Sequence, residues 1–182
     1  MKVIDTALPG AKVLVPRVFG DERGFFMESW NARTFAAASI EAAFVQDNHS
    51  RSAKGVLRGL HYQIQSPQGK LIRVIAGAVY DVAVDLRASS PTFGRWVGIE
   101  LSAENKLQCW VPPGFAHGFL SLKDGTELLY KCTDFYAVQA ERALLWNDPV
   151  LGIIWPLEGI GAPILSAKDA AAKPLAEAEV FP

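Results

Sequence analysis

The stretch that decides the fold is Ala78–Leu86, which has the sequence AVYDVAVDL. Large apolar side chains alternate in it with small or acidic ones, and a period of two is that of a β-strand. One face holds Tyr80, Val82, Val84 and Leu86, and the other holds Asp81, Ala83 and Asp85. We expect the apolar face to lie in the core and the polar face to look into a cavity or solvent.

Short runs of β-branched and aromatic residues continue on both sides of this strand. Turn residues such as Ser89-Ser90-Pro91 and Pro112-Pro113-Gly114 separate them. Strands at this spacing are typical of an all-β sandwich or barrel with antiparallel connections. The predicted strands are Ile72–Ile75, Ala78–Leu86, Trp96–Leu101, Leu107–Val111, Phe119–Leu122 and Glu127–Phe135.

Two short helices are expected among these strands. Asn31 is a candidate N-cap for one or two helical turns within the alanine-rich segment Asn31–Ala43. Ser166–Asp169 is a variant capping box that opens a helix through Ala172, and Pro174 ends it. We expect the tail after Pro174 to be loosely held.

Size and charge limit the class of protein. The 182 residues, half of them hydrophobic, predict one domain covering residues 1–182 with an apolar core. The net charge of −1 disfavours nucleic acid or an anionic membrane as partner. No apolar run approaches the roughly 20 residues of a membrane helix, and the N-terminus lacks a signal-peptide core, so we expect a cytoplasmic protein. Cys109 and Cys132 are expected to be free, buried thiols.

Basic side chains gather in a part of the sequence that has the composition of a sheet. Leu57–Gln63 (LRGLHYQ) and Gln68–Arg73 (QGKLIR) contain Arg58, His61 and Lys70. Charged groups rarely occupy half-buried positions unless they have a partner. The stretch therefore indicates a site for a small anionic ligand.

The same region matches the two sequence motifs of cupins. Gly55, His61, Gln63 and Gln68 have the spacing of the first motif, and Pro112–His117 supplies the Pro-x-Gly-x-x-His of the second. Glutamine occupies two of the four positions at which cupins usually hold a metal, and amides are poor ligands for transition metals. We therefore expect no metal and no cofactor, and chemistry carried out by side chains.

The chain closely resembles one metal-free cupin family, dTDP-4-dehydrorhamnose 3,5-epimerase. The resemblance implies an all-β, cupin-type jelly roll with a few short helices, and a homodimer. The matching segments are Asp21–Phe26, Gln46–Ser50, Leu57–Gln63, Gln68–Lys70, Ala78–Arg87, Pro112–Phe119, Tyr130–Cys132, Trp146–Pro149 and Ser166–Asp169.

The resemblance implies an isomerase that acts in dTDP-L-rhamnose biosynthesis. Its substrate would be dTDP-4-dehydro-6-deoxy-D-glucose, inverted at carbons 3 and 5 to give dTDP-4-dehydro-L-rhamnose. By this resemblance His61 is the base and Tyr130 the acid, which suits an imidazole that titrates near about 6.5 and a phenol that titrates near about 10. Lys70 would stabilise the enolate oxygen, and Asp169 would orient His61.

The family pattern also matches residues for the nucleotide, the diphosphate and the sugar. Guanidinium groups meet phosphate oxygens in bidentate geometry, a lysine adds a point charge, and Phe135-Tyr136 is suited to stacking. The chain departs from the pattern at Ala137–Ala140, where the family usually carries a proline. The substrate-binding candidates are Arg23, Glu28, Gln46, Asp47, Asn48, Arg58, His117, Glu141 and Lys168.

Several of these assignments have an alternative. Asp81 and Asp85 are rival partners for His61, Tyr130 suits a core position in a strand, and Asp169 suits a helix cap whether or not it contacts His61. For the whole protein, the alternatives are an epimerase that inverts one carbon, a metal-dependent cupin enzyme such as a dioxygenase, and a sugar-nucleotide-binding protein without turnover. A binding protein without turnover has no need of a base, an acid, an oxyanion donor and an orienting carboxylate together.

Overall fold

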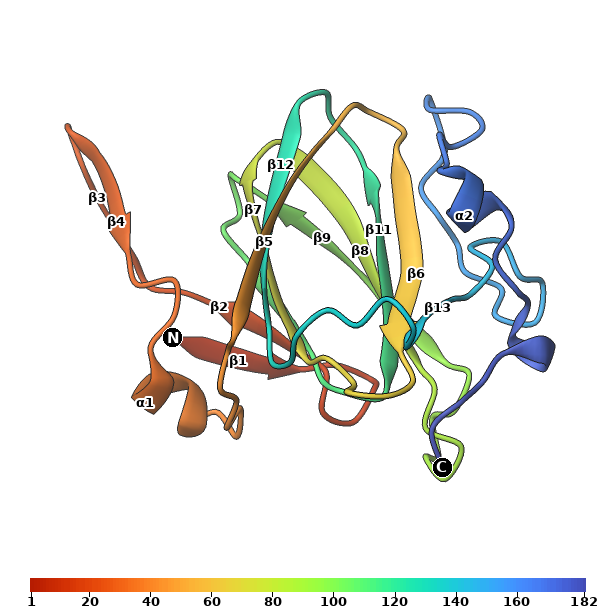
Figure 1. The fold of residues 1–182 in the computed structure, drawn as a ribbon. Helices are drawn as coiled ribbons and strands as arrows, with labels where there is room; N and C mark the ends of the chain where they lie inside the picture. Colours follow the sequence, from red (N-terminus) through yellow and green to blue (C-terminus); the bar gives the residue numbers. More distant parts are fainter.

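The computed structural model describes residues 1–182 and consists mainly of two antiparallel sheets that face each other (Figure 1). This arrangement is the predicted cupin-type jelly roll. The first sheet runs in the order β1 (Lys2–Asp5), β2 (Lys12–Val15), β10 (Gln108–Val111), β7 (Lys70–Ala76), β12 (Thr126–Cys132) and β5 (Gln46–Ser52). The second runs in the order β13 (Glu141–Ala143), β6 (Leu57–Gln63), β11 (Phe115–Ser121), β8 (Ala78–Asp85) and β9 (Trp96–Ser102).

All six predicted strands are present, and two of them differ from the prediction by more than two residues at one end. The strand expected at Phe119–Leu122 begins earlier, at Phe115, because Gly114 makes the preceding turn with a φ of +94°. The strand expected to reach Phe135 ends at Cys132. Beyond it, the carbonyls of Asp134 and Phe135 accept hydrogen bonds from glutamine side chains instead of from a neighbouring strand.

Three apolar clusters hold the layers together. The first lies between the two sheets and includes Ile72, Phe119 and the free thiol of Cys109. The second lies between the five-stranded sheet and the chain from Leu144 onward, and the third lies where the helix α1 (Ala32–Ala36) covers the six-stranded sheet. Burial of these faces supplies the main driving force for folding. Cys132 is also free and buried, as predicted for both cysteines.

The alternation in β8 is confirmed, and both of its faces are buried. Val82 and Val84 pack under the C-terminal part of the chain. On the other face, Asp81 meets His117, while Asp85 accepts hydrogen bonds from the side chains of Arg87, Ser90 and Thr92. The acidic face is therefore directed to internal polar partners and not to solvent.

The two predicted caps are present. The side chain of Asn31 accepts hydrogen bonds from the backbone N–H groups of Arg33 and Thr34 at the start of α1. The side chain of Ser166 accepts one from the N–H of Asp169 at the start of α2 (Ala167–Ala170). Each cap satisfies N–H groups that the first helical turn leaves without partners.

The tail after Pro174 is well tied to the barrel, so the expectation of a loose tail is wrong. After the short 3₁₀ helix η1 (Leu175–Glu177), the N–H of Phe181 donates to the carbonyl of Leu86 at 3.0 Å. The hydroxyl of Tyr62 donates to the carbonyl of Glu179 at 2.7 Å. These bonds fix the segment that follows α2 against β6 and β8.

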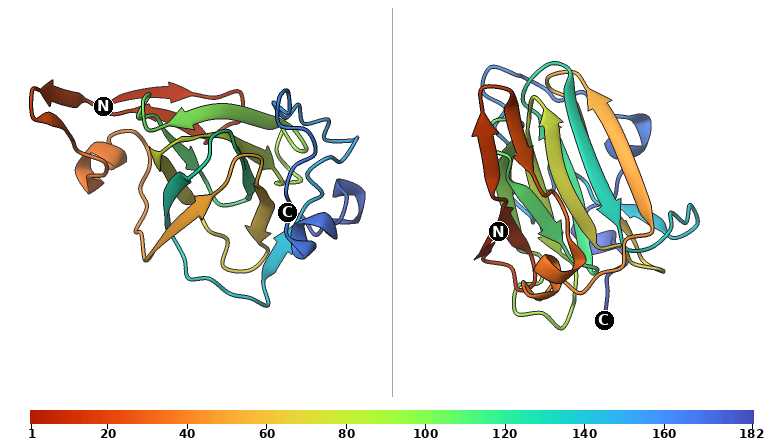
Figure 2. Two further views of the ribbon diagram at one scale, coloured as in Figure 1. Left: turned by 90° about the horizontal axis from the view of Figure 1, so that it is seen from above. Right: turned by 90° about the vertical axis from the view of Figure 1, so that its left-hand side faces the viewer.

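A hairpin projects away from the barrel on the side opposite α2 (Figures 1 and 2). It consists of β3 (Val18–Asp21) and β4 (Gly24–Met27) and forms a sheet of its own. Its aromatic side chains are exposed, Phe25 to 61% and Phe26 to 71%. An exposed aromatic surface of this kind is typical of a region that contacts another molecule.

Candidate active site

His61 and Asp169 form a hydrogen-bonded pair. Nε2–H of His61, on β6, donates to Oδ1 of Asp169, on α2, at 2.6 Å. The other carboxylate oxygen accepts a hydrogen bond from the hydroxyl of Ser166 at 2.9 Å. Burial raises the pKa of Asp169. The hydrogen bond from His61 and the charge of His61 lower this pKa by a larger amount, so it lies below its ordinary value. The carboxylate is thus ionised and holds the ring in one orientation.

An irregularity in β6 brings Arg58 and His61 to the same side of the strand. Residues three positions apart point to opposite faces of a regular strand. Here the pairing with β11 shifts register between His117 and Phe119, and Gly59 has a φ of +122°. As a result, Arg58 and His61 both line one internal hollow.

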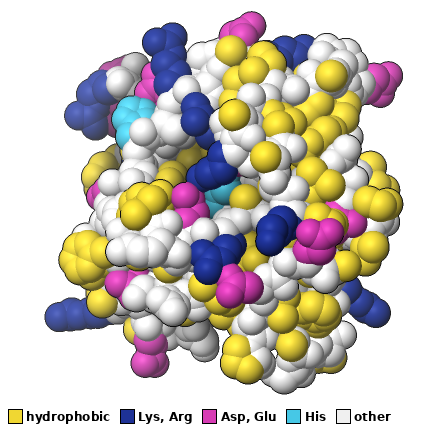
Figure 3. Space-filling view, turned by 45° about the vertical axis from the view of Figure 1, so that its right-hand side comes forward, with side chains coloured by type: hydrophobic (Ala, Val, Ile, Leu, Met, Phe, Trp, Pro, Cys, Tyr) yellow, Lys and Arg dark blue, Asp and Glu magenta, His cyan; other side chains and the backbone are white.

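Two hollows adjoin inside the barrel and share the side chains His61, Lys70 and Tyr130. One has a volume of about 320 Å³ and is also lined by Glu141 and the exposed Tyr136, and the other has a volume of about 190 Å³. His61 belongs to the five-stranded sheet, whereas Lys70 and Tyr130 belong to the six-stranded sheet. A substrate in the hollows is therefore flanked by an imidazole on one side and a phenol and an ammonium on the other. In Figure 3 the surface is hollowed around a recessed histidine, with basic and acidic side chains about it.

Burial shifts the pKa values of two of these groups in opposite directions. It lowers the pKa of Lys70, because the charged ammonium loses hydration. It raises the pKa of Tyr130, because the charged phenolate is the form that burial penalises. Tyr130 is consequently a protonated donor at neutral pH.

A second histidine–carboxylate pair lies at the inner end of the site. Nε2–H of His117 donates to Oδ2 of Asp81 at 2.8 Å, and both residues are buried. His117 lines the smaller hollow together with Arg58 and Ser50. Asp81 is thereby the partner of His117, and Asp169 is the carboxylate that contacts His61.

The mouth of the larger hollow is formed by polar side chains from several elements. Lys168 donates to Oε1 of Glu141 at 2.7 Å, and the hydroxyl of Tyr136 donates to Oε2 of the same carboxylate at 2.9 Å. Gln46 and Asn48, on β5, also line this hollow. Glu141 therefore joins α2 to the loop before β13, although this loop departs from the family pattern.

Four predicted substrate-binding residues do not line these hollows, and one of them, Lys168, is joined to the larger hollow through Glu141. Arg23 lies on the projecting hairpin and pairs with Asp21. Glu28 accepts a hydrogen bond from the side chain of Asn31. The carboxylate of Asp47 is exposed and paired with Lys131 on the outer side of β5.

The structure also adds Ser50, to which the sequence pattern assigned no role in the site. Ser50 lines the smaller hollow, and its hydroxyl has no hydrogen-bond partner within the chain. Its position two residues after Asn48 on the same strand was the available signal, since such residues share a face.

The four side chains at the cupin metal-ligand positions are bound to protein groups. Nε2 of His61 and Nε2 of His117 are held by carboxylates, and the amides of Gln63 and Gln68 are bound to backbone groups. No group of three or more His, Cys, Asp or Glu side chains is arranged to hold a metal ion. No helix is long and apolar enough to cross a membrane.

Comparisons with known proteins agree with this geometry. Residues 5–177 match the family model described as dTDP-4-dehydrorhamnose 3,5-epimerase. The chain is 59% identical, over the full length of both, to the dTDP-4-dehydrorhamnose 3,5-epimerase of Pseudomonas aeruginosa.

Solved structures extend the comparison to ligand complexes. A dTDP-6-deoxy-D-glucose-3,5-epimerase from Legionella pneumophila, in complex with dTDP-4-keto-L-rhamnose, superposes with a TM-score of 0.94 at 52% identity, over 98% of this chain and 94% of that one. A 3'-monoepimerase from Streptomyces bikiniensis, in complex with dTDP-quinovose, gives a TM-score of 0.87 at 36% identity, over 94% and 86%. From the family match and the relatives, together with the site, we conclude that the chain belongs to the dTDP-4-dehydrorhamnose 3,5-epimerase family.

Proposed function

We propose that this protein epimerises carbons 3 and 5 of dTDP-4-dehydro-6-deoxy-D-glucose to give dTDP-4-dehydro-L-rhamnose, an isomerase step of dTDP-L-rhamnose biosynthesis. One observation carries the proposal: His61, held by Asp169, and Tyr130 line the same hollow from opposite sheets, and Lys70 lines it too. Inversion at a carbon needs a base and an acid on opposite sides of it. The site supplies both.

In the proposed mechanism, the keto group at carbon 4 acidifies the neighbouring C–H bonds. Because Nε2 of His61 is bound to Asp169, Nδ1 is the ring nitrogen that accepts the proton. The electron pair of the C–H bond moves to the oxygen at carbon 4 as an enolate, and the Lys70 ammonium stabilises that oxygen. Tyr130 then gives its proton to the opposite face of the carbon. Exchange with solvent restores both groups before the second carbon reacts.

The remaining pocket residues supply contacts for the rest of the substrate. Arg58 suits a diphosphate because its guanidinium forms paired hydrogen bonds to phosphate oxygens. Lys168 adds a positive charge at the mouth, where Glu141 holds it. Gln46, Asn48 and His117 provide hydrogen-bonding groups along the hollows. Arg23, Glu28 and Asp47 remain predicted binding residues that this arrangement of a single chain leaves outside the hollows.

The main rival is an enzyme that inverts a single carbon. Both kinds of enzyme occur among the structural relatives, but identity is higher to the double epimerases, 59% and 52%, than to the 3'-monoepimerase, at 36%. This difference favours inversion at both carbons. The metal-dependent cupin is disfavoured by the hydrogen bonds that occupy Gln63 and Gln68.

The test is proton NMR of dTDP-4-dehydro-6-deoxy-D-glucose with the purified protein in deuterated water. We expect deuterium to enter at carbons 3 and 5, and the His61→Ala variant to abolish this entry. Entry at one carbon alone would select the single-carbon epimerase. No exchange by folded wild-type protein contradicts the proposal, and near-stoichiometric iron, manganese or zinc in that protein would select the metal enzyme.

We propose in addition that the protein is a homodimer whose projecting hairpin reaches the partner. The exposed Phe25 and Phe26 favour burial against a second molecule, and Arg23 on the same hairpin is remote from its own hollows. A hairpin laid over the partner subunit would bring Arg23 to a substrate there. Sedimentation equilibrium of wild type and of a Phe25→Ser, Phe26→Ser variant tests the dimer, which the variant should weaken.

We also propose a cytoplasmic location. The nucleotide-linked substrate supports this location, since such sugars are assembled from nucleoside triphosphates in the cytoplasm. Fractionation of cells that express the protein, followed by detection in the soluble cytoplasmic fraction, tests this location.

A further inference from the structure

Gln63 is a buried side chain whose amide is fully occupied by backbone groups. It is 4% exposed, and it lies at the end of β6, two residues after His61. Its Nε2 donates to the carbonyls of Ser66, at 2.8 Å, and Phe135, at 3.2 Å. Its Oε1 accepts from the N–H of Ala137 at 2.8 Å.

Gln68 makes a similar contact with Asp134, the residue directly before Phe135. Its Nε2 donates to the carbonyl of Asp134 at 2.8 Å. The neighbouring Gly69 and Thr133 add two more bonds, Gly69 N–H to Thr133 Oγ1 at 2.8 Å and Thr133 N–H to the Gly69 carbonyl at 3.0 Å. The loop between β12 and β13, residues 133–140, is therefore attached at its start and in its middle.

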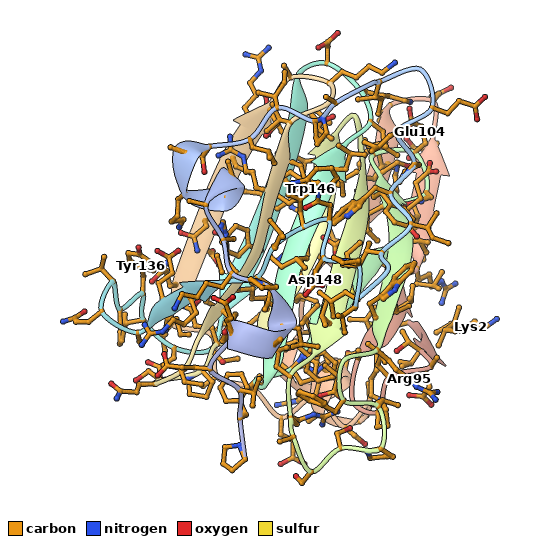
Figure 4. The ribbon with its side chains drawn as sticks, turned by 90° about the vertical axis from the view of Figure 1, so that its right-hand side faces the viewer. Lys2, Arg95, Glu104, Tyr136, Trp146 and Asp148 are labelled. Carbon is orange, nitrogen blue, oxygen red and sulfur yellow. The ribbon has the colours of Figure 1, made fainter.

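This loop carries the aromatic side chain that stands at the mouth of the site. Tyr136 is half exposed, at 53%, and lines the larger hollow together with His61. Its hydroxyl donates to Glu141, and its N–H donates to Oε1 of Gln46. Figure 4 shows Tyr136 on this loop at the margin of the molecule, away from Trp146 and Asp148.

The bonding pattern requires an amide at position 63. Two carbonyls need donors and one N–H needs an acceptor, and of the side chains of this length only glutamine offers both. A carboxylate would accept from Ala137 but face the two carbonyls without a proton. Carbonyl groups that are buried without a donor cost free energy, so with a carboxylate at position 63 we expect residues 133–140 to leave their present position.

We propose that Gln63, assisted by Gln68, is a positioning residue that holds residues 133–140 so that Tyr136 covers the bound substrate. Gln63, at a position where cupins usually hold a metal, thus acts on substrate binding, and proton transfer is left to His61 and Tyr130. The inference rests on the proposed function for its substrate, while its structural part concerns the loop alone.

The test compares Gln63→Met with Gln65→Met. The first removes all three bonds at nearly unchanged length, and the second changes an exposed glutamine on the neighbouring loop, whose side chain forms no hydrogen bond. Hydrogen–deuterium exchange of residues 133–140, without ligand, is expected to rise at least about tenfold in Gln63→Met and to stay unchanged in Gln65→Met. Unchanged exchange in both variants would overturn the proposal that Gln63 holds residues 133–140.

Function is then measured on the same variants. We expect Gln63→Met to raise the Kd for dTDP and the KM for the sugar nucleotide about tenfold, with kcat within about threefold of wild type. A fall in kcat at unchanged KM, or faster exchange of the loop at unchanged affinity, contradicts the positioning role. If wild type binds dTDP without turning over the sugar nucleotide, the proposed function fails, and the dTDP affinities still decide the role of Gln63.

A double-mutant cycle shows whether Gln63 acts through Tyr136. Tyr136→Ala alone should weaken dTDP binding, and adding Gln63→Met to it should weaken binding little further, because the ring to be positioned is gone. Full additivity of the two effects would overturn the proposal. Thermal melts establish that each variant is folded, and Gln63→Glu, which keeps only the acceptor, serves as a second variant at the same position.

Discussion

Nε2 of His61 and Oδ1 of Asp169 lie 2.6 Å apart, although 108 positions separate the two residues in the sequence. The contact joins β6 to α2, and the cap residue Ser166 binds the same carboxylate. Asp169 therefore has two roles at once, in the helix cap and in holding the ring of His61.

Asp169→Asn should reduce kcat about 100-fold or more, because the neutral amide cannot stabilise the imidazolium that forms when His61 takes a proton. Steady-state kinetics measure the loss. Ser166→Ala is the matched control: it removes the cap, costs about 1 kcal/mol of stability, and leaves the His61 contact in place. An Asp169→Asn enzyme with the kcat of the Ser166→Ala enzyme would show that the carboxylate acts only as a cap.

Tyr130→Phe should separate proton removal from inversion. His61 can still take a proton from carbon 3 or 5, but the opposite face has no donor, so deuterium should enter with little inverted product. We expect epimerisation to fall at least about 100-fold. Proton NMR in deuterated water follows both events in one sample. Loss of exchange and of inversion in equal measure would contradict the assignment of Tyr130 as acid alone.

Lys70 should set the alkaline limit of activity. The ammonium is the active form, and burial lowers its pKa, so activity is lost as pH rises through that lowered value. Tyr130 has a raised pKa and stays protonated beyond this point. Lys70→Arg keeps the charge at all accessible pH and should move the alkaline limb of kcat/KM upward, even if the rate is lower. If the alkaline limb of kcat/KM does not move in Lys70→Arg, the loss of activity at high pH belongs to another group.

Gly59→Ala should destabilise the fold and the site together. A Cβ at position 59 would lie 2.5 Å from Cα of Gly118, and the φ of +122° is unfavourable for alanine. Gly24→Ala is the control, since Gly24 has a φ of +129° with nothing within 4 Å of the added Cβ. The control should cost about 1 kcal/mol in thermal or denaturant unfolding, and Gly59→Ala clearly more. Equal losses would mean that the contact with β11 relaxes easily.

The placement of Arg23 can be tested by mixing two inactive variants. In a hybrid dimer of Arg23→Ala and His61→Ala subunits, one site combines an intact His61 with the intact Arg23 of the partner subunit. If the hairpin serves the partner's site, mixing after subunit exchange restores activity to that site. If Arg23 serves its own subunit, every hybrid site carries a defect and no activity returns.

The sequence by itself determined those features that depend on neighbours in the chain. The period of two in Ala78–Leu86, the caps at Asn31 and Ser166, and the turn at Gly114 are local, and all four are present in the structure. The resemblance of motifs also identified His61, Lys70, Tyr130 and Asp169, which the structure brings together. Local propensity and pattern suffice for such features because each residue's backbone choice is set by its immediate neighbours.

Only the tertiary structure decided which distant groups meet. It paired Asp81 with His117, fastened the tail to Leu86, and left Arg23 on a hairpin outside its own pocket. It also turned Arg58 and His61 to one face through the register shift at Gly59, where strict alternation would have separated them. These outcomes depend on how two sheets and a C-terminal segment pack against each other, and packing between remote segments leaves no periodic signal in a single sequence.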